Sequence, residues 1–343
     1  MPMKKLTNCE HCGGNLTYNT AKAVVVCEHC DSVYPMPKKS RTAKLLRKYT
    51  IDFMPEATND FVEQYMCKSC NSKHFVQAGK VSTRCPSCAD TEIYKINEQK
   101  INPDGIIPFQ LKKEQAVSIF DKWLKKRKFA PSDLIQMAKK GKLSQVYVPV
   151  FNINGNTVCA YNAMVKKVHT DSDSGTIYST MHTVQDVVSD ELKNVVLCAN
   201  SVADSSLIEE VVRVDQSNIV PYSSEYLFGY TSATTDLSIH DLMNDLQNSI
   251  EKSLEKEVRA KLKDKYDEIV HLSCNTKLHG VTFNYTYVPV FMNHYKYNNK
   301  KYHCYICGTT GKVSGSAPKS AGKILGVVGI IAAIIGLAIL LIL

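Results

Sequence analysis

The chain has 343 residues, of which 44% are apolar and 22% are charged, and its formal net charge is +9. This apolar content excludes a disordered chain, and the length exceeds that of one compact domain. We therefore expect several folded units, with basic surfaces that suit an anionic partner unless they are simply solvated.

The N-terminal part contains two pairs of Cys-x-x-Cys motifs. In each pair, 14 residues separate the first motif from the second. Each motif places two thiolates on a tight turn, and a hairpin between the turns lets four sulfur atoms surround Zn²⁺. We predict two structural zinc ions, one in a zinc ribbon over residues 1–37 and one in a second ribbon over 61–98. The predicted ligands are Cys9, Cys12, Cys27, Cys30, Cys67, Cys70, Cys85 and Cys88.

Four thiolates complete the coordination of each metal ion and leave no position for a reactive water, so a catalytic zinc is not expected. A segment this short buries too little apolar surface to fold alone, and metal binding would supply the missing free energy. A thioredoxin-like redox role for one Cys-x-x-Cys motif is the alternative. That role requires no second motif at a fixed distance.

A basic linker is predicted over residues 38–60, and it opens with the sequence KKSRTAKLLRKY. Its cations, with no acid among them, suit the phosphates of a nucleic acid or anionic lipid headgroups. A solvated linker is an equally good interpretation, because few aromatic residues are present to stack on bases. The candidate polyanion-binding residues are Lys38, Lys39, Arg41, Lys44, Arg47 and Lys48.

A domain boundary is indicated at INPDGIIPF, and residues 99–318 are predicted to form an α+β domain of helices and antiparallel sheet. The sequence YVPVF occurs at 147–151 and again at 287–291, each time after a helical pattern and before a hairpin. We interpret this as two related helix-hairpin units that face one another, consistent with an internal duplication. Pro149 and Pro289 lack an amide hydrogen, so both strands are expected at sheet edges or bulges.

The final segment, 319–343, ends in 20 residues without a polar side chain, from Ile324 to Leu343. A helix of this length spans the hydrocarbon core of a bilayer, so we expect a C-terminal transmembrane helix. Because lysines precede it and the N-terminus lacks a signal peptide, we expect a tail-anchored, single-pass protein of the cytoplasmic membrane with its bulk in the cytosol. Small residues four apart, such as Gly329 and Ala333, would let two such helices form a homodimer.

Four segments and the apolar terminus carry a resemblance to a known family: PDGIIPFQLKKEQAVSIFDKWLKKRKFAPSDL, YVPVF, YLFGYTSATTDLSIHDLMNDLQNSIEKSLEKEVR and TTGKVSGSAPKSAGK. They resemble a bacterial family of zinc-ribbon membrane proteins, described as containing a transcription-factor-IIB-type zinc ribbon and sometimes as primosomal or replication-restart helicase-like. The resemblance implies this architecture and the eight zinc ligands, but no particular activity. The chain departs from the family at YHCYICGTTGK, where we expect Cys304 and Cys307 to be buried thiols rather than half of a zinc site.

An enzyme is not expected. A helicase needs the phosphate-binding loop G-x-x-x-x-G-K-[ST], but Val313 follows Gly311-Lys312 and Ile324 follows Gly322-Lys323. No nucleophile elbow or H-E-x-x-H motif occurs either. The leading hypothesis is a membrane-tethered binding or scaffold protein that holds a protein partner at the cytoplasmic face of the lipid bilayer. The alternative is a membrane-tethered nucleic-acid-binding accessory protein of replication or transcription, whose affinity would fall steeply with salt.

Overall fold

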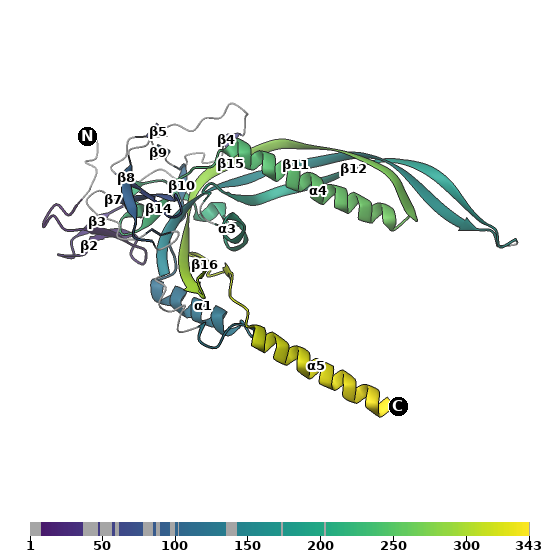
Figure 1. Cartoon of the computed structure of the whole chain (residues 1–343). Coiled ribbons are helices and arrows are strands. Elements are labelled where there is room, and N and C mark those ends of the chain that lie inside the picture. The colour runs from purple at the N-terminus through teal and green to yellow at the C-terminus, as the bar shows by residue number, and fades with distance from the viewer. Residues whose placement is uncertain are drawn as a thin grey trace.

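The computed structural model describes residues 8–36, 47–48, 57–58, 62–77, 85–86, 90–96, 100–101, 103–134, 143–172, 174–201 and 204–342. A sheet-rich body carries a long arm and a terminal helix that extend from it in different directions (Figure 1). The ribbons at the N-terminal end of the chain lie on the side of the body away from the arm.

The described residues are mainly β-structure, so the predicted α+β chain with a transmembrane helix is wrong. One 12-stranded sheet dominates, beside a 3-stranded and a 2-stranded sheet. The helices within the described residues are α1 (Lys113–Lys125), α3 (Ser205–Val211), α4 (Ile239–Lys263) and α5 (Ala321–Ile342), with two 3-10 turns, η1 (Gln216–Asn218) and η2 (Ser224–Leu227). The strands are β1 (Leu16–Asn19), β2 (Val24–Cys27), β3 (Val33–Pro35), β4 (Arg47–Lys48), β5 (Ala57–Thr58), β6 (Val62–Cys67), β7 (Lys73–Gln77), β8 (Ile93–Ile96), β9 (Lys100–Ile101), β10 (Gly105–Ile106), β11 (Leu143–Thr170), β12 (Ile177–Cys198), β13 (Val220–Pro221), β14 (Thr231–Ala233), β15 (Glu268–Tyr297), β16 (Lys300–Cys307) and β17 (Val313–Gly315).

The two YVPVF sequences pair with each other at the centre of the large sheet. Strands β11 and β15 are antiparallel, and their register places Tyr147 opposite Pro289 and Pro149 opposite Tyr287. Both tyrosines are fully buried. The two repeats therefore face one another directly, and they bring their aromatic side chains into one core.

Both prolines lie in central strands, so their expected place at an edge or bulge is wrong. On its outer side, β11 pairs with β14 before Pro149 and with β12 after it. Strand β15 likewise pairs with β10 before Pro289 and with β16 after it. Each proline thus lies where the outer neighbour changes, and its carbonyl oxygen accepts from the N–H of Ala199 (3.0 Å) or Gly308 (2.7 Å). At that point the missing amide hydrogen of proline therefore removes no hydrogen bond between strands.

The strand order relates the two halves of the sheet by an approximate two-fold arrangement. The first unit runs β10, α1, β11 and β12, and the second runs β14, α4, β15 and β16. The short first strand of each unit pairs with the long strand of the other unit. Strand β10 pairs in parallel with β15, and β14 pairs in parallel with β11. This reciprocal pairing has the pattern of an internal duplication.

Helices cover the two faces of the body. On one face, α1 packs Phe120 and Trp123 against a cluster that contains Phe109, Tyr147 and Phe291. On the other face, α3 packs its buried residues against valines of β11 and β15. Because β-branched and aromatic residues fill both faces, the central strands are buried on both sides.

The arm is built from the distal parts of β11, β12 and β15 with α4 along one face (Figure 1). At about 3.3 Å per residue, the 28 residues of β11 give an element on the order of 90 Å long. Val258 and Leu262 of α4 pack on Tyr161, Ala163 and Val165 of β11. This contact holds the helix against the arm.

Helix α5 occupies the segment for which the sequence predicts a membrane anchor, and its side chains are described as far as Ile335, apart from Ala333. Over the part of the chain that the structure describes, no helix combines the length and the hydropathy needed to cross a membrane. This finding corrects the predicted transmembrane helix and the tail-anchored single-pass location in the cytoplasmic membrane. The homodimer stays a prediction.

Replacing Phe291 by alanine tests the central core. Its ring is fully buried and packs edge-on against Phe109 at a centroid distance of 5.0 Å. We expect the free energy of unfolding to fall by about 3–5 kcal/mol, as measured by urea denaturation. The matched control is Phe129→Ala, whose side chain is 42% exposed, with an expected loss below about 1 kcal/mol. Equal losses in the two variants would contradict this assignment of the core.

Candidate metal centres and the uncovered face of the arm

The first candidate metal centre lies between the two Cys-x-x-Cys turns of the N-terminal ribbon. We call each of these turns a knuckle. The sulfur atoms of Cys9, Cys12, Cys27 and Cys30 all lie within 4.8 Å of one another. The Sγ–Sγ distance is 3.5 Å between Cys9 and Cys30 and 3.6 Å between Cys12 and Cys27. In a tetrahedral site with bonds of about 2.3 Å, sulfurs lie about 3.8 Å apart. The four thiols therefore fit a metal ion without rearrangement of the backbone.

Two backbone turns present these sulfurs. The N–H of Gly13 donates to the carbonyl oxygen of Cys9 at 2.8 Å, and the N–H of Asp31 donates to that of Cys27 at 3.2 Å. Gly13 and Asp31 have φ of 70° and 56°, a region that glycine, asparagine and aspartate enter most readily. Each turn buries its first cysteine and exposes its second, so the candidate site lies at the surface of the ribbon.

Tyr34 is a partner of this centre that the cysteine spacing does not reveal. Its hydroxyl lies 3.2 Å from Sγ of Cys9 and 3.3 Å from Nδ1 of His11, and it accepts the N–H of Glu10 at 2.9 Å. The hydrogen bond from this hydroxyl is the largest cause that lowers the pKa of the Cys9 thiol to about 5. Since a thiolate is the form that binds metal, Tyr34 prepares Cys9 as a ligand.

The second candidate centre is described through three of its four predicted ligands. The sulfurs of Cys67, Cys70 and Cys85 lie within 4.8 Å of one another, with 3.6 Å between the last two. Cys88 lies outside the described residues. The turn after Cys67 repeats that of the first ribbon, because the N–H of Asn71 donates to the Cys67 carbonyl oxygen at 2.9 Å and Asn71 has φ of 57°.

The two ribbons attach to the body in different ways. Tyr18 of the first ribbon donates its N–H to the carbonyl oxygen of Phe228 at 3.0 Å, and its ring packs edge-on against Tyr226 at 5.0 Å. The second ribbon is part of the 12-stranded sheet, because β7 pairs with β14. His74 at this junction is fully buried, and burial lowers its pKa to about 4. The second ribbon is therefore integral to the sheet that contains β11 and β15.

A fourth turn of the same shape occurs at Cys307, without the second cysteine. The N–H of Gly311 donates to the Cys307 carbonyl oxygen at 3.0 Å, and Gly311 has φ of 73°. Thr310 occupies the position that Cys12 has relative to Cys9. Cys304 and Cys307 are both buried, and among the described residues the metal-ligand clusters include neither of them. This turn forms a knuckle that does not contribute to a metal site in the described chain.

The two thiols next to this turn differ in their chemistry. Burial raises the pKa of the Cys304 thiol to about 12. Burial also raises the pKa of Cys307, but hydrogen bonds from the hydroxyls and amides of Thr309 and Thr310 outweigh it, and the net shift is downward. The Oγ1 of Thr309 lies 3.1 Å from the sulfur of Cys307.

Of the basic linker 38–60, the structure describes residues 47–48 and 57–58. Lys38, Lys39, Arg41 and Lys44 lie outside the described residues. Arg47 and Lys48 form β4, which pairs with Phe283 and Thr282 of β15. The linker therefore reaches the root of the arm, and binding of a polyanion by these six residues stays a prediction.

The arm leaves one of its faces without a covering element among the described residues. In the β11–β12 register, Tyr161, Ala163 and Val165 turn toward α4, so the even-numbered residues of β11 and the odd-numbered residues of β12 turn away from it. We call this surface the uncovered face. Its exposed apolar side chains are Met164 (45%), Val168 (42%), Ile177 (71%), Met181 (52%) and Val187 (55%).

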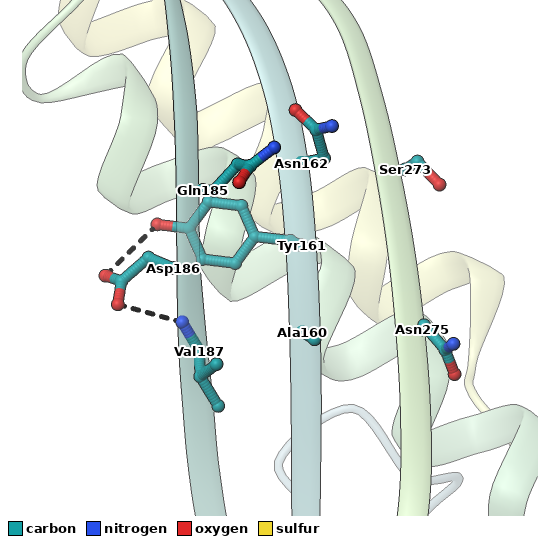
Figure 2. A pocket seen from close by; sticks show the side chains of 8 residues that line it. All are labelled: Ala160, Tyr161, Asn162, Gln185, Asp186, Val187, Ser273 and Asn275. Atoms are coloured by element: carbon teal, nitrogen blue, oxygen red, sulfur yellow. Dashed lines mark hydrogen bonds between the residues drawn. The ribbon is translucent and has the colours of Figure 1, made fainter.

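A groove of about 480 Å³ lies on this part of the arm. Figure 2 shows carboxamides from its three strands, Gln185 of β12, Asn162 of β11 and Asn275 of β15. At its border, the Asp186 carboxylate accepts from Nζ of Lys261 at 2.9 Å and from the Tyr161 hydroxyl at 3.5 Å. The bond from Lys261 is the main cause of the lowered pKa of Asp186. The groove residues of the uncovered face themselves carry no charge.

Comparison with known proteins gives one distant relative. The chain is 24% identical over 236 residues to the uncharacterized protein YdjG of Bacillus subtilis (strain 168), which covers 65% of this chain and 65% of that protein. The chain thus spans about two thirds of the length of this relative. No family model matches the sequence and no solved structure matches it. Neither family nor fold therefore indicates whether the protein is an enzyme, and the resemblance to zinc-ribbon membrane proteins stays a prediction.

The Tyr34→Phe variant tests the role assigned to Tyr34. Without the hydroxyl, the pKa of Cys9 should rise toward its ordinary value, so protons compete better with metal. We expect the midpoint pH of metal release during acidification to move upward, as measured with a chromophoric chelator. Tyr94→Phe, which removes an exposed hydroxyl in β8, is the control and should leave the midpoint of the first centre unchanged. An unchanged midpoint in the Tyr34 variant would rule out this role.

Proposed function

We propose that this protein is a zinc-stabilised scaffold that binds a protein partner through the uncovered face of its arm. The observation that carries the proposal is the composition of that face. It combines exposed methionine, valine and isoleucine side chains with uncharged carboxamides over a groove. Protein interfaces are depleted of charged residues at their centre and enriched in methionine and aromatic side chains, so a protein is the partner class that this face suits best.

Zinc is the metal that we propose for both candidate centres. Soft thiolate ligands at tetrahedral spacing favour zinc over calcium or magnesium, which prefer oxygen. The residues that would hold the first ion are Cys9, Cys12, Cys27 and Cys30, and those for the second are Cys67, Cys70, Cys85 and Cys88. When bound, each ion would supply structural cross-linking rather than reactivity, because four thiolates leave no position for a substrate.

Nucleic-acid binding is the second candidate, supported by the position of β4 beside β15. Phosphate contacts need cations at the contact surface. On the uncovered face the groove residues offer none, and Lys166 outside the groove is paired with Glu268 at 3.4 Å. A nucleic acid would therefore contact the basic linker, whereas a protein would contact the arm. The two candidates predict different contact sites on one chain.

Metal content tests the zinc proposal. Purified full-length protein should hold two zinc ions per chain by elemental analysis, one per four-cysteine set. The variant Cys9→Ser with Cys12→Ser should retain one. Cys307→Ser changes a knuckle cysteine that lies outside both clusters, so its metal content should equal that of the unchanged protein. Two ions in the Cys9 and Cys12 variant would show that these residues are not ligands.

Photo-crosslinking tests the scaffold proposal. A photoreactive amino acid at Gln185 lies in the groove, and one at Lys256 lies at an exposed position of α4. In cells that make the protein, we expect the probe at Gln185 to yield a discrete protein adduct that the probe at Lys256 does not yield. The adduct should persist at high salt, since an apolar contact changes little with ionic strength.

The paired substitutions Met164→Gln and Val187→Thr supply the specificity control. They replace two exposed apolar side chains of the uncovered face, so they should abolish the adduct without changing the melting temperature. Identical adducts from both probe positions, or nucleic acid in place of protein at Gln185, would contradict the proposal.

A further inference from the structure

We propose that a pocket at the base of α5 binds a phosphate ester. This basal pocket has a volume of about 510 Å³ and is lined by residues 126–130 and 315–319. The first segment follows the C-terminal end of α1 and the second leads into α5, and the two helix ends lie together at this side of the body (Figure 1). The site is remote from the cysteine clusters and from the uncovered face, and it depends on neither proposal above.

The pocket is strongly cationic. Lys126, Arg127, Lys128 and Lys319 are among its lining residues, and none of its lining residues is acidic. Within the described ranges, no carboxylate forms an ion pair with any of these four cations. A cation beyond the C-terminal end of a helix interacts favourably with the carbonyl groups there. This effect explains the position of Lys126 after α1, but it does not explain the position of Lys319 on the other segment. Exposed cationic residues from two segments of the chain therefore border one pocket, an arrangement that suits an anion.

Hydrogen bonds hold the two walls of the pocket together. The N–H of Ser320 donates to the carbonyl oxygen of Phe129 at 2.8 Å, and Nζ of Lys323 donates to that of Ala130 at 2.7 Å. On the other wall, the Tyr295 hydroxyl donates to the carbonyl oxygen of Ser316 at 2.8 Å. These hydrogen bonds join the segment after α1 to the beginning of α5 and anchor the segment before α5 on β15.

The chemistry of the lining selects the ligand class. Guanidinium and ammonium groups together match the several acceptor oxygens of a phosphate. Phe129, Ala317 and Pro318 add apolar surface, which suits the organic part of an ester better than a bare ion. Two sources supply this chemistry, a soluble phosphate ester and a phospholipid headgroup, since exposed apolar side chains of α5 such as Leu325 begin directly beyond Lys323.

The chain contains a built-in reporter for binding at this site. Trp123 is its sole tryptophan, and the guanidinium carbon of Arg127 lies 4.5 Å from the centre of the indole ring. An anion that engages Arg127 would alter this cation–π contact. Tryptophan emission of the full-length protein in a neutral detergent therefore reads out occupancy of the pocket.

The experiment titrates the protein with glycerol 3-phosphate and, separately, with micelles containing phosphatidylglycerol. Phosphatidylcholine micelles and sodium chloride at equal ionic strength are the controls. We expect a saturable change in emission with at least one phosphate ester. Saturation by glycerol 3-phosphate identifies a soluble source, and saturation by phosphatidylglycerol alone identifies a lipid headgroup. No saturable change with either probe, or an equal change with sodium chloride, would overturn the proposal.

Matched variants locate the site. Lys128→Gln with Lys319→Gln removes one cation from each wall, and binding should weaken by about tenfold or more, because charge-assisted contacts are lost. Lys113→Gln with Lys300→Gln removes the same charge from exposed positions outside the pocket and should change affinity by less than about twofold. Circular dichroism verifies that both variants fold. Equal weakening in the two would mean that only net charge matters and would also overturn the proposal.

Discussion

The antiparallel pairing of β11 with β15 is the constraint on which the other elements depend. It extends from Leu143 opposite Asn293 to Lys166 opposite Glu268, so it forms both the centre of the body and the length of the arm. Strands β10, β12, β14 and β16 attach to its outer sides, and the second ribbon reaches the sheet through β14. In the arm, where one face is covered by α4 and the other is not, a slip of one residue would turn the buried side chains outward, because side chains alternate along a strand. The buried tyrosines of the two YVPVF sequences oppose such a slip.

The four knuckle turns, at Cys9, Cys27, Cys67 and Cys307, distinguish the shape of one knuckle from the connection between two knuckles. The turn at Cys307 has the same hydrogen bonds and positive φ as the turns at Cys9 and Cys67, yet it lies outside the metal-ligand clusters of the described residues. A knuckle turn therefore forms at Cys307, between β16 and β17, although threonine stands where the second cysteine would be. What a metal ion adds is the connection between two knuckles, which a hairpin of this size cannot maintain by apolar contacts alone.

Part of this structure could be predicted from the sequence. The features that were missed or misplaced each have a physical reason. Equal spacing identified the cysteine clusters, because coordination chemistry acts over a short stretch of chain. Tyr34 was missed, since its contact with Cys9 spans 25 residues and leaves no pattern. The prolines were misplaced because the rule for a central strand assumes one continuous neighbour, whereas here the neighbour changes at each proline. The membrane prediction rested on the composition of one segment, and the helices described do not support it.

The exchange of short strands between the two units has a consequence for the order of folding. Ile106 pairs with Tyr287 and Val146 pairs with Thr231, so neither unit can complete its sheet from its own residues. During synthesis, β11 leaves the ribosome long before β15, and its inner edge stays open for roughly 10 s at ordinary elongation rates. An open edge of this length is a template for pairing with another chain. A nascent first half thus depends on protection until the second half arrives, and a chain truncated between the units would exchange strands with its neighbours instead.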